Sequence, residues 1–283
     1  MSRDAGLRRT IERVLGTVGM IVEDAERVPA HTGDAALVVV DREARIDAGA
    51  ALSTLAAPVV IVGDDLEDDS VIAAMLEAPV SHLVRDLHAG DLEIMSEKLA
   101  SGDLFGLEKY LARGAPVGQR TIGNDADKRH AIDEVCAWAE TIGERRRTVH
   151  RLATVTDELM MNALGALPAS PGVQGGHVAL RWGSDRRAIA ISVSDSCGAL
   201  RQRDVVDQVR RARSERGRPR RELGPRRGAG IGLYLVLANV ASLVINVEVG
   251  RRTEVVCLFD RATPERPAAS FVRSFHVFRT AAP

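Results

Sequence analysis

Hydrophobic and polar positions along the first 89 residues predict short buried strands separated by helices. Residues 7–15 place Leu7, Ile11, Val14 and Leu15 on one face of a helix. Four short runs rich in β-branched residues predict strands: 19–24, 36–41, 58–64 and 80–84. Two segments between them suit helices: 46–56 and 69–77. Nearly all-apolar strands separated by helices indicate an α/β domain with a parallel sheet covered on both faces.

Residues 90–124 follow as a predicted helical connector, which Gly102 interrupts and the stretch from Gly114 to Pro116 ends. Its apolar residues have the spacing of two helix faces: Leu92, Met95 and Leu99, then Phe105, Leu107 and Leu111.

Residues 125–262 predict a second domain with its own order of elements. Two helices, at 127–143 and 144–164, come before two strands joined by a tight turn, at 177–182 and 188–195. The elements after the polar segment 201–227 are a helix and a strand pair: 231–241, 243–249 and 253–260. Helices beside an antiparallel or mixed sheet form an α+β sandwich.

Residues 263–283 form a tail with alternating apolar positions. Phe271, Arg273, Phe275 and Val277 would lie on one side of a strand. We expect such a strand to join a sheet edge, either within the chain or across a homodimer; a segment folded back for packing is the alternative.

Composition narrows the class of protein without naming a function. Hydrophobic residues make up 45% of the chain and charged residues 27%, as in ordinary globular proteins. The net charge of −1 argues against broad nucleic-acid binding. The three cysteines lack metal-site spacing, and no secretory leader is visible, which predicts a reduced cytoplasmic protein. The uncharged run 230–247 contains glycine, serine and asparagine, so we expect no membrane span.

Glu158 and Asn162 are the first candidate site residues. They lie four residues apart in the predicted helix 144–164, so they are about 40° apart around its axis. An amide oxygen suits Mg²⁺, and a carboxylate can accept a proton. The alternative is a pair of polar residues on the solvated face of a helix.

Four short motifs occur in an order that resembles the ATP-site boxes of the gyrase, chaperone, histidine-kinase and mismatch-repair (GHKL) ATPases. They are DELMMNA at 157–163, DSCGAL at 195–200, GAGIGL at 228–233 and RTEV at 252–255. The resemblance implies a Bergerat-type α+β sandwich that binds ATP with Mg²⁺, and it covers residues 125–262.

By this resemblance, Glu158 is the general base, and Asn162 holds Mg²⁺ on the triphosphate. Asp195 accepts the adenine amino group, and Thr253 supports that end of the site. The implied nucleotide-binding positions also include glycines and a helix start: Gly198, Gly228, Gly230, Gly232 and Leu233. Cys197 and Ala199 stand where the family usually has glycines, which implies some loss of affinity for adenine.

The helix pair that leads directly into the Glu158 motif is similar to the anti-sigma-factor serine kinases. This branch implies a protein partner, namely a sigma factor, an anti-sigma antagonist or another signalling protein, and transfer of the ATP γ-phosphate to a partner protein. Two alternatives stay open: an ATP-gated interaction module without turnover, and a histidine-kinase-type ATPase that acts on a separate phosphoacceptor protein.

Residues 1–89 resemble a degenerate response-regulator receiver domain. Asp41 ends a strand where that family carries its phosphoacceptor, and Arg85 stands where a lysine is usual. Gly63 replaces a serine or threonine. We expect a domain that is used for contacts, with phosphorylation of Asp41 as the alternative.

The polar segment 201–227 contains eleven arginines and corresponds to the ATP lid in the resemblance. It is interpreted as a solvated loop. Alternatively, its arginines reach the triphosphate or dock an acidic partner. Nucleic-acid binding is a third alternative, which the absence of aromatic residues from the segment disfavours.

Overall fold

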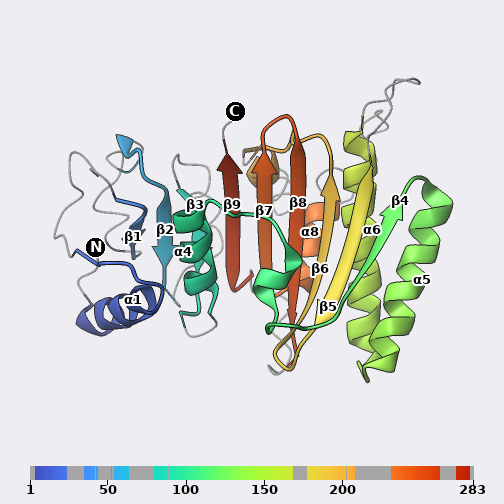
Figure 1. Cartoon of the computed structure of the whole chain (residues 1–283), viewed down its shortest axis with the longest axis horizontal. Helices are drawn as coiled ribbons and strands as arrows, with labels where there is room; N and C mark the ends of the chain where they lie inside the picture. Colours follow the sequence, from blue (N-terminus) through green and yellow to red (C-terminus); the bar gives the residue numbers. More distant parts are fainter. Residues whose placement is uncertain are drawn as a thin grey trace. The chain divides into compact units, whose positions relative to one another are not determined.

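The computed structural model describes residues 4–23, 35–41, 43, 52, 54–63, 80–87, 90–167, 177–201, 203–207, 231–261 and 272–280. The chain has a mixed α/β fold (Figure 1). It divides into two compact units: unit 1 is Met1–Leu104 with Arg273–Val277, and unit 2 is Phe105–Val272 with Phe278–Pro283. The helix predicted at 69–77 lies outside the described residues, as does most of the one predicted at 46–56.

Helix α1 (Ala5–Thr17) of unit 1 begins at a side-chain cap. The carboxylate of Asp4 accepts hydrogen bonds from the backbone amides of Gly6 at 2.7 Å and Leu7 at 3.1 Å. Ile11, Val14 and Leu15 are buried, which confirms most of the apolar face predicted for this helix.

The sheet of unit 1 contains three parallel strands, β1 (Val38–Val40), β2 (Val59–Val62) and β3 (Val80–Val84). Their parallel arrangement confirms the prediction. Strand β9 (Ser274–Thr280) pairs antiparallel with β3, and Phe275 lies opposite Leu83. The tail therefore joins a sheet within its own chain, one of the two arrangements expected.

The strand predicted at 19–24 is wrong over its described part. Residues 20–23 have no regular structure, and the side chain of Ile21 is 93% exposed. No strand pairs with this segment among the described residues, so its β-branched residues have no sheet on which to pack.

The connector forms a helix in its first half only. Helix α4 (Asp91–Ser101) ends at Gly102, which has a φ of +69°. A second helix face at Phe105, Leu107 and Leu111 does not form, because Gly106 has a φ of +113° and only the 3-10 turn η2 (Leu107–Tyr110) follows. Strand β4 (Val117–Ile122) then comes where no strand was predicted.

Three helices of unit 2 confirm the predicted ones: α5 (Asp125–Thr141), α6 (Arg146–Ala166) and α8 (Ile231–Asn239). Helix α5 begins at Asn124, whose side-chain oxygen accepts from the amides of Ala126 at 2.8 Å and Asp127 at 3.0 Å. Asp127 accepts in turn from the amide of Gly123 at 3.0 Å, which completes the cap.

The sheet of unit 2 is antiparallel. The strands β4, β5 (Val178–Ser184), β6 (Ala188–Asp195), β8 (Arg252–Asp260) and β7 (Ser242–Glu248) are neighbours in this order. We call the side that packs on α6 and α8 the helix face and the side that packs on η2 the back face (Figure 1). The arrangement is compatible with the predicted α+β fold.

The uncharged run 230–247 is divided between α8 and the first residues of β7, so it is not one continuous helix. Among the residues that the structure describes, no helix has the length and apolar character needed to cross a membrane.

Candidate functional site

Glu158 and Gly232 lie against each other where α6 packs on the start of α8. A Cβ atom at Gly232 would come to 2.2 Å from Oε2 of Glu158, so the position has room only for glycine while the carboxylate stays there. Gly232 is buried, and its backbone φ is not positive. A side chain at this position would therefore displace the Glu158 carboxylate, although the backbone conformation itself would accept one.

The carboxylate of Glu158 lies in a partly desolvated place. Burial raises the pKa of this side chain above its ordinary value, and the neighbouring carboxylate of Asp157 raises it further. Lys128 on α5 opposes the shift, but its ammonium group pairs directly with Asp157 at 2.7 Å. A carboxylate with a raised pKa is a stronger proton acceptor.

Asn162 is exposed one turn further along α6. Its neighbour Ala163 is buried, so the helix turns the amide away from the core. The two oxygen-bearing side chains of the first candidate pair thus lie on one helix, one half-buried and one accessible. Oxygen donors of this kind fit Mg²⁺, which keeps several waters and takes few protein ligands when it is bound to phosphates.

Asp195 ends strand β6 on the helix face, directly opposite Thr253 in the ladder with β8. Burial raises the pKa of its carboxyl, while hydrogen bonds from the amides of Cys197 and Gly198 lower it in part. The amide of Cys197 donates to Oδ1 at 2.8 Å. Asp195 is therefore a half-buried acceptor held by its own loop.

The loop after Asp195 is fixed on two sides. The thiol of Cys197 donates to the carbonyl of Ala166 at 3.4 Å, which ties the loop to the last turn of α6. On the other side, the amide of Gly250 donates to the carbonyl of Gly198 at 3.1 Å. The loop thus connects the end of the helix that carries Asn162 with the β7–β8 turn.

Gly198 cannot carry a side chain in this arrangement. It has a φ of +59°, and a Cβ atom would lie 2.0 Å from the carbonyl oxygen of Glu248 and 2.7 Å from the amide nitrogen of Gly250. The resemblance assigns this glycine to adenine, whereas the contacts within the chain already require it.

Leu233, the last residue of the GAGIGL motif, is buried in α8. Gly228 and Gly230 lie outside the described residues, as does the arginine-rich segment from 208 onward. The described part of the motif is therefore the helix start that contains Gly232 and Leu233.

Arg151 is a residue that the sequence reasoning missed. Its guanidinium donates from Nε at 3.0 Å and from Nη2 to the carbonyl oxygen of Asn239, the last residue of α8. The group also lies 5.7 Å from the ring centroid of Phe259. A cation at a helix C-terminus is stabilising, so α6 holds α8 at one end with Arg151 and meets its other end with Glu158.

The signal for Arg151 was present in the sequence. It precedes Glu158 by seven residues, about two helical turns, and so lies on the same side of α6.

No family model and no curated protein matches the chain. In the described residues, no group of three or more His, Cys, Asp or Glu side chains could hold a metal ion.

Proposed function

We propose that residues 125–262 form an ATP-binding domain of the GHKL kind, and that the protein is a cytoplasmic serine/threonine kinase of the anti-sigma-factor type. The observation that carries this proposal is the close approach of Gly232 to Glu158. Two motifs that are about seventy residues apart in the sequence meet there, as an ATP site of this family requires. The pairing of Asp195 with Thr253 adds a second meeting of motifs.

Asp195 would recognise the adenine end of ATP. Its half-buried carboxylate is an acceptor that the exocyclic amino group of adenine can use, and a charged acceptor in a partly desolvated place discriminates strongly against bases that lack the donor. Thr253, buried opposite Asp195 in the ladder, would support the adenine end of the site.

The phosphate end would lie at the start of α8. Helix N-termini favour negative charge, and Gly232 in the first turn leaves its side-chain space to the carboxylate of Glu158. Asn162 would hold Mg²⁺, which offsets charge on the triphosphate when it is bound.

Phosphate transfer would use Glu158 as the proton acceptor. The hydroxyl oxygen of a partner serine or threonine forms a bond to the γ-phosphorus, the bond from that phosphorus to the ADP oxygen breaks, and the hydroxyl proton passes to Glu158. The raised pKa of Glu158 suits this role, because it brings the carboxylate closer to the basicity that proton transfer needs.

A specific observation favours a second candidate, an ATP-gated interaction module without turnover. The Cys197 thiol and the Gly198 carbonyl fix the loop beside Asp195 to the rest of unit 2. A loop held in this way adapts less to a ligand than the glycine-rich loop usual in the family. Slow or absent hydrolysis together with nucleotide-dependent binding of a partner protein would favour this candidate.

Unit 1 would serve as a receiver-like contact domain. Its parallel strands β1, β2 and β3 resemble part of a receiver sheet, and Asp41 directly follows β1. Asp41 is buried, which suits a structural role better than modification by a phosphodonor. A homodimer and a protein partner from sigma-factor regulation belong to the same proposal.

Calorimetry with Mg-ATP and Mg-ADP tests the proposal. The wild-type protein is expected to bind both nucleotides, and Asp195→Asn is expected to weaken binding at least about tenfold, because the amide replaces a charged acceptor. Asp133→Asn, on an exposed part of α5, is the matched control and should bind like the wild type. Absence of binding by the wild-type protein would refute the proposal.

The type of phosphotransfer needs a separate test. A partner protein that the kinase modifies would carry acid-stable phosphate if a serine or threonine is the acceptor, and acid-labile phosphate if a histidine is. Glu158→Ala should abolish transfer while nucleotide still binds. Unchanged transfer by this variant would show that Glu158 is not the base.

A further inference from the structure

The back face of the unit 2 sheet contains a fully buried carboxylate. Glu254 follows Thr253 on β8 and is 0% exposed. Successive residues of a strand point to opposite faces of the sheet. Thr253 therefore faces Asp195 on the helix face, whereas Glu254 lies on the back face.

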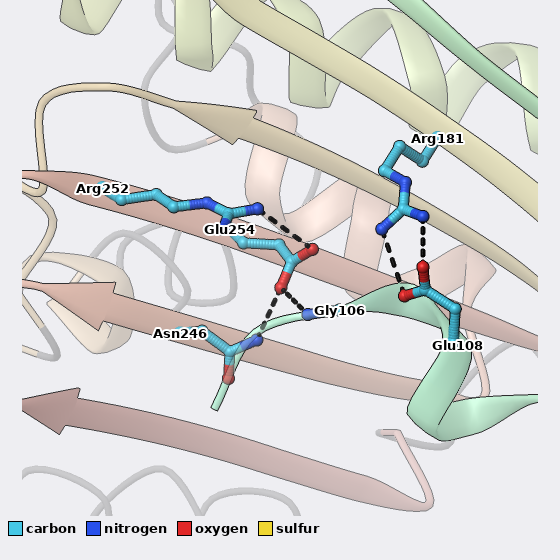
Figure 2. Close-up of polar contacts among 6 residues, drawn as sticks. All are labelled: Gly106, Glu108, Arg181, Asn246, Arg252 and Glu254. Atoms are coloured by element: carbon cyan, nitrogen blue, oxygen red, sulfur yellow. Dashed lines mark hydrogen bonds and ion pairs between the residues drawn. The ribbon is translucent and has the colours of Figure 1, made fainter. Parts of the chain in front are cut away.

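The carboxylate of Glu254 accepts one of its hydrogen bonds from the segment at the start of unit 2. Its Oε2 accepts from Nδ2 of Asn246 at 3.0 Å and from the backbone amide of Gly106 at 3.0 Å (Figure 2). Nη2 of Arg252 lies 3.9 Å from Oε1. A buried carboxylate needs such donors, because leaving it unpaired is costly. The amide of Gly106 is thus part of the environment that β8 requires.

The residues after Gly106 hold the same segment on the sheet. We call Phe105–Tyr110 the latch. The guanidinium of Arg252 lies 4.5 Å from the ring centroid of Phe105, and Leu107 is fully buried. Glu108 accepts two hydrogen bonds from Arg181 on β5, one of them at 3.1 Å from Nη1 (Figure 2).

The hydrogen bonds between Glu108 and Arg181 change the pKa of the Glu108 carboxyl. They lower the pKa of the Glu108 carboxyl below its ordinary value, and the charge of Arg181 contributes as well. The latch is therefore fixed to β8 through its backbone and to β5 through a charged side chain.

We propose that docking of the latch on the back face and nucleotide binding on the helix face are coupled through β8, so that each stabilises the other. This inference rests on the proposed ATP site. Thr253 and Glu254 share one peptide unit, so a change in strand position that favours Asp195 also changes the position of the carboxylate that holds Gly106. Coupling between two sites is reciprocal by thermodynamic necessity.

The latch is also the first segment of unit 2 along the chain. Phe105 directly follows Leu104, where the first stretch of unit 1 ends. A displacement of Leu104 reaches Gly106 over two residues, and through Glu254 it reaches the strand that carries Thr253. The latch is thus the part of unit 2 that lies nearest in sequence to the first stretch of unit 1.

The variant for the test removes side chains of the latch and leaves the sheet unchanged. Phe105→Ala combined with Glu108→Ala takes away the ring under Arg252 and the partner of Arg181. Both side chains are at least partly exposed, so the fold is expected to survive, which a thermal melt checks. Arg113→Ala, an exposed residue just after the latch, is the matched control.

Two measurements decide the proposal. Amide hydrogen exchange at Gly106 is followed by NMR with and without saturating Mg-ATP, and the dissociation constant of Mg-ATP is measured for all three proteins. Mg-ATP is expected to slow exchange at Gly106 in the wild type. The double variant is expected to exchange faster at Gly106 and to bind Mg-ATP about tenfold more weakly, within the usual range of coupling, while Arg113→Ala matches the wild type.

The outcomes separate the two proposals. If the wild type binds Mg-ATP and exchange at Gly106 does not respond, the coupling is wrong and the ATP site stands. The same holds if the double variant exchanges faster at Gly106 but binds as tightly as the wild type, or does not exchange faster at all. If the wild type does not bind Mg-ATP, the proposed function itself is wrong, and the coupling with it.

Discussion

A methyl group on the α carbon of Gly232 would lie 2.2 Å from Oε2 of Glu158, closer than side-chain atoms approach each other in folded proteins. The relationship links a helix start to a carboxylate on a neighbouring helix. It explains a glycine in a helix, where glycine is otherwise unfavourable by about 1 kcal/mol relative to alanine.

Gly232→Ala is expected to displace the Glu158 carboxylate, which is the end of a flexible side chain, so the cost should cancel most of the roughly 1 kcal/mol that alanine gains over glycine inside a helix. Gly165→Ala on α6 is the matched control. A Cβ atom there meets nothing within 4 Å, so alanine should stabilise by roughly 0.5–1 kcal/mol. Urea unfolding followed by tryptophan fluorescence measures both. Equal stabilities of the two variants would contradict the close packing of Gly232.

Gly198→Ala tests the loop beside Asp195. The side chain would meet the Glu248 carbonyl at 2.0 Å in addition to the strain of a left-handed backbone, so we expect a loss of about 3 kcal/mol. Gly250→Ala has the same left-handed strain, with a φ of +73°, but open space around the Cβ atom. It should lose only about 1–2 kcal/mol. If both variants lost a similar free energy of unfolding, backbone strain and not the contact with Glu248 would determine the cost of alanine at Gly198.

Arg151→Met should lower the local stability of α8. The variant loses two charge-assisted hydrogen bonds to Asn239 while keeping most of the aliphatic stem, and such bonds contribute about 1.5–3 kcal/mol. Hydrogen exchange of the α8 amides is expected to accelerate. Arg146→Met, exposed at the start of the same helix, serves as control and should leave α8 protected. If α8 were equally protected in both variants, Arg151 would not anchor it.

Unit 1 is expected to lose stability in mild acid. His82 and His276 are buried with ring centroids 5.5 Å apart, and burial is the main cause that lowers the pKa of both. Lys98 lowers both values further, and the pKa of His276 falls to about 3. Because the folded state resists protonation, stability is constant above the unfolded pKa of about 6.5 and decreases below it.

Between pH 7.5 and pH 5, His276 alone should reduce the free energy of unfolding by about 2 kcal/mol. Protection factors of the β3 amides, corrected for intrinsic exchange, measure the change in unit 1. His276→Gln should make the protection of the β3 amides depend less on pH. Substitution of the exposed His130 by Gln should leave this dependence unchanged. If the protection of the β3 amides in His276→Gln changed with pH as it does in the wild type, His276 would not be the cause of the loss of stability in acid.

Strands with dense β-branched residues were predictable from the sequence, and strands that depend on a neighbour were not. Residues 59–62 are all buried, so burial on both faces appears directly in their composition. Strand β4, Val117–Ile122, was missed because only Ile122 is buried, and its pairing with β5 makes it a strand. Ile21 shows the opposite error: its side chain favours a strand, but no partner lies beside it in the described residues.

The candidate site was predictable where a motif has a local spacing. Glu158 and Asn162 share a helix, and the sequence places them together. Glu254 was overlooked although it follows Thr253 directly, because its role depends on Gly106, which lies 148 residues earlier. Long-range hydrogen bonds to a backbone amide have no signature in composition or periodicity, so residues of this kind become visible only in the folded chain.

Strand β9 has a consequence for the order of events on the ribosome. Domains generally fold as units during synthesis, with the N-terminal one first. Here, residues Arg273–Val277 complete a unit that otherwise ends at Leu104. Strand β3 therefore has an unpaired edge while all residues of unit 2 up to Val272 are translated, and such an edge invites pairing with other chains. The unit that is synthesised first is therefore not complete until almost the whole chain has been made.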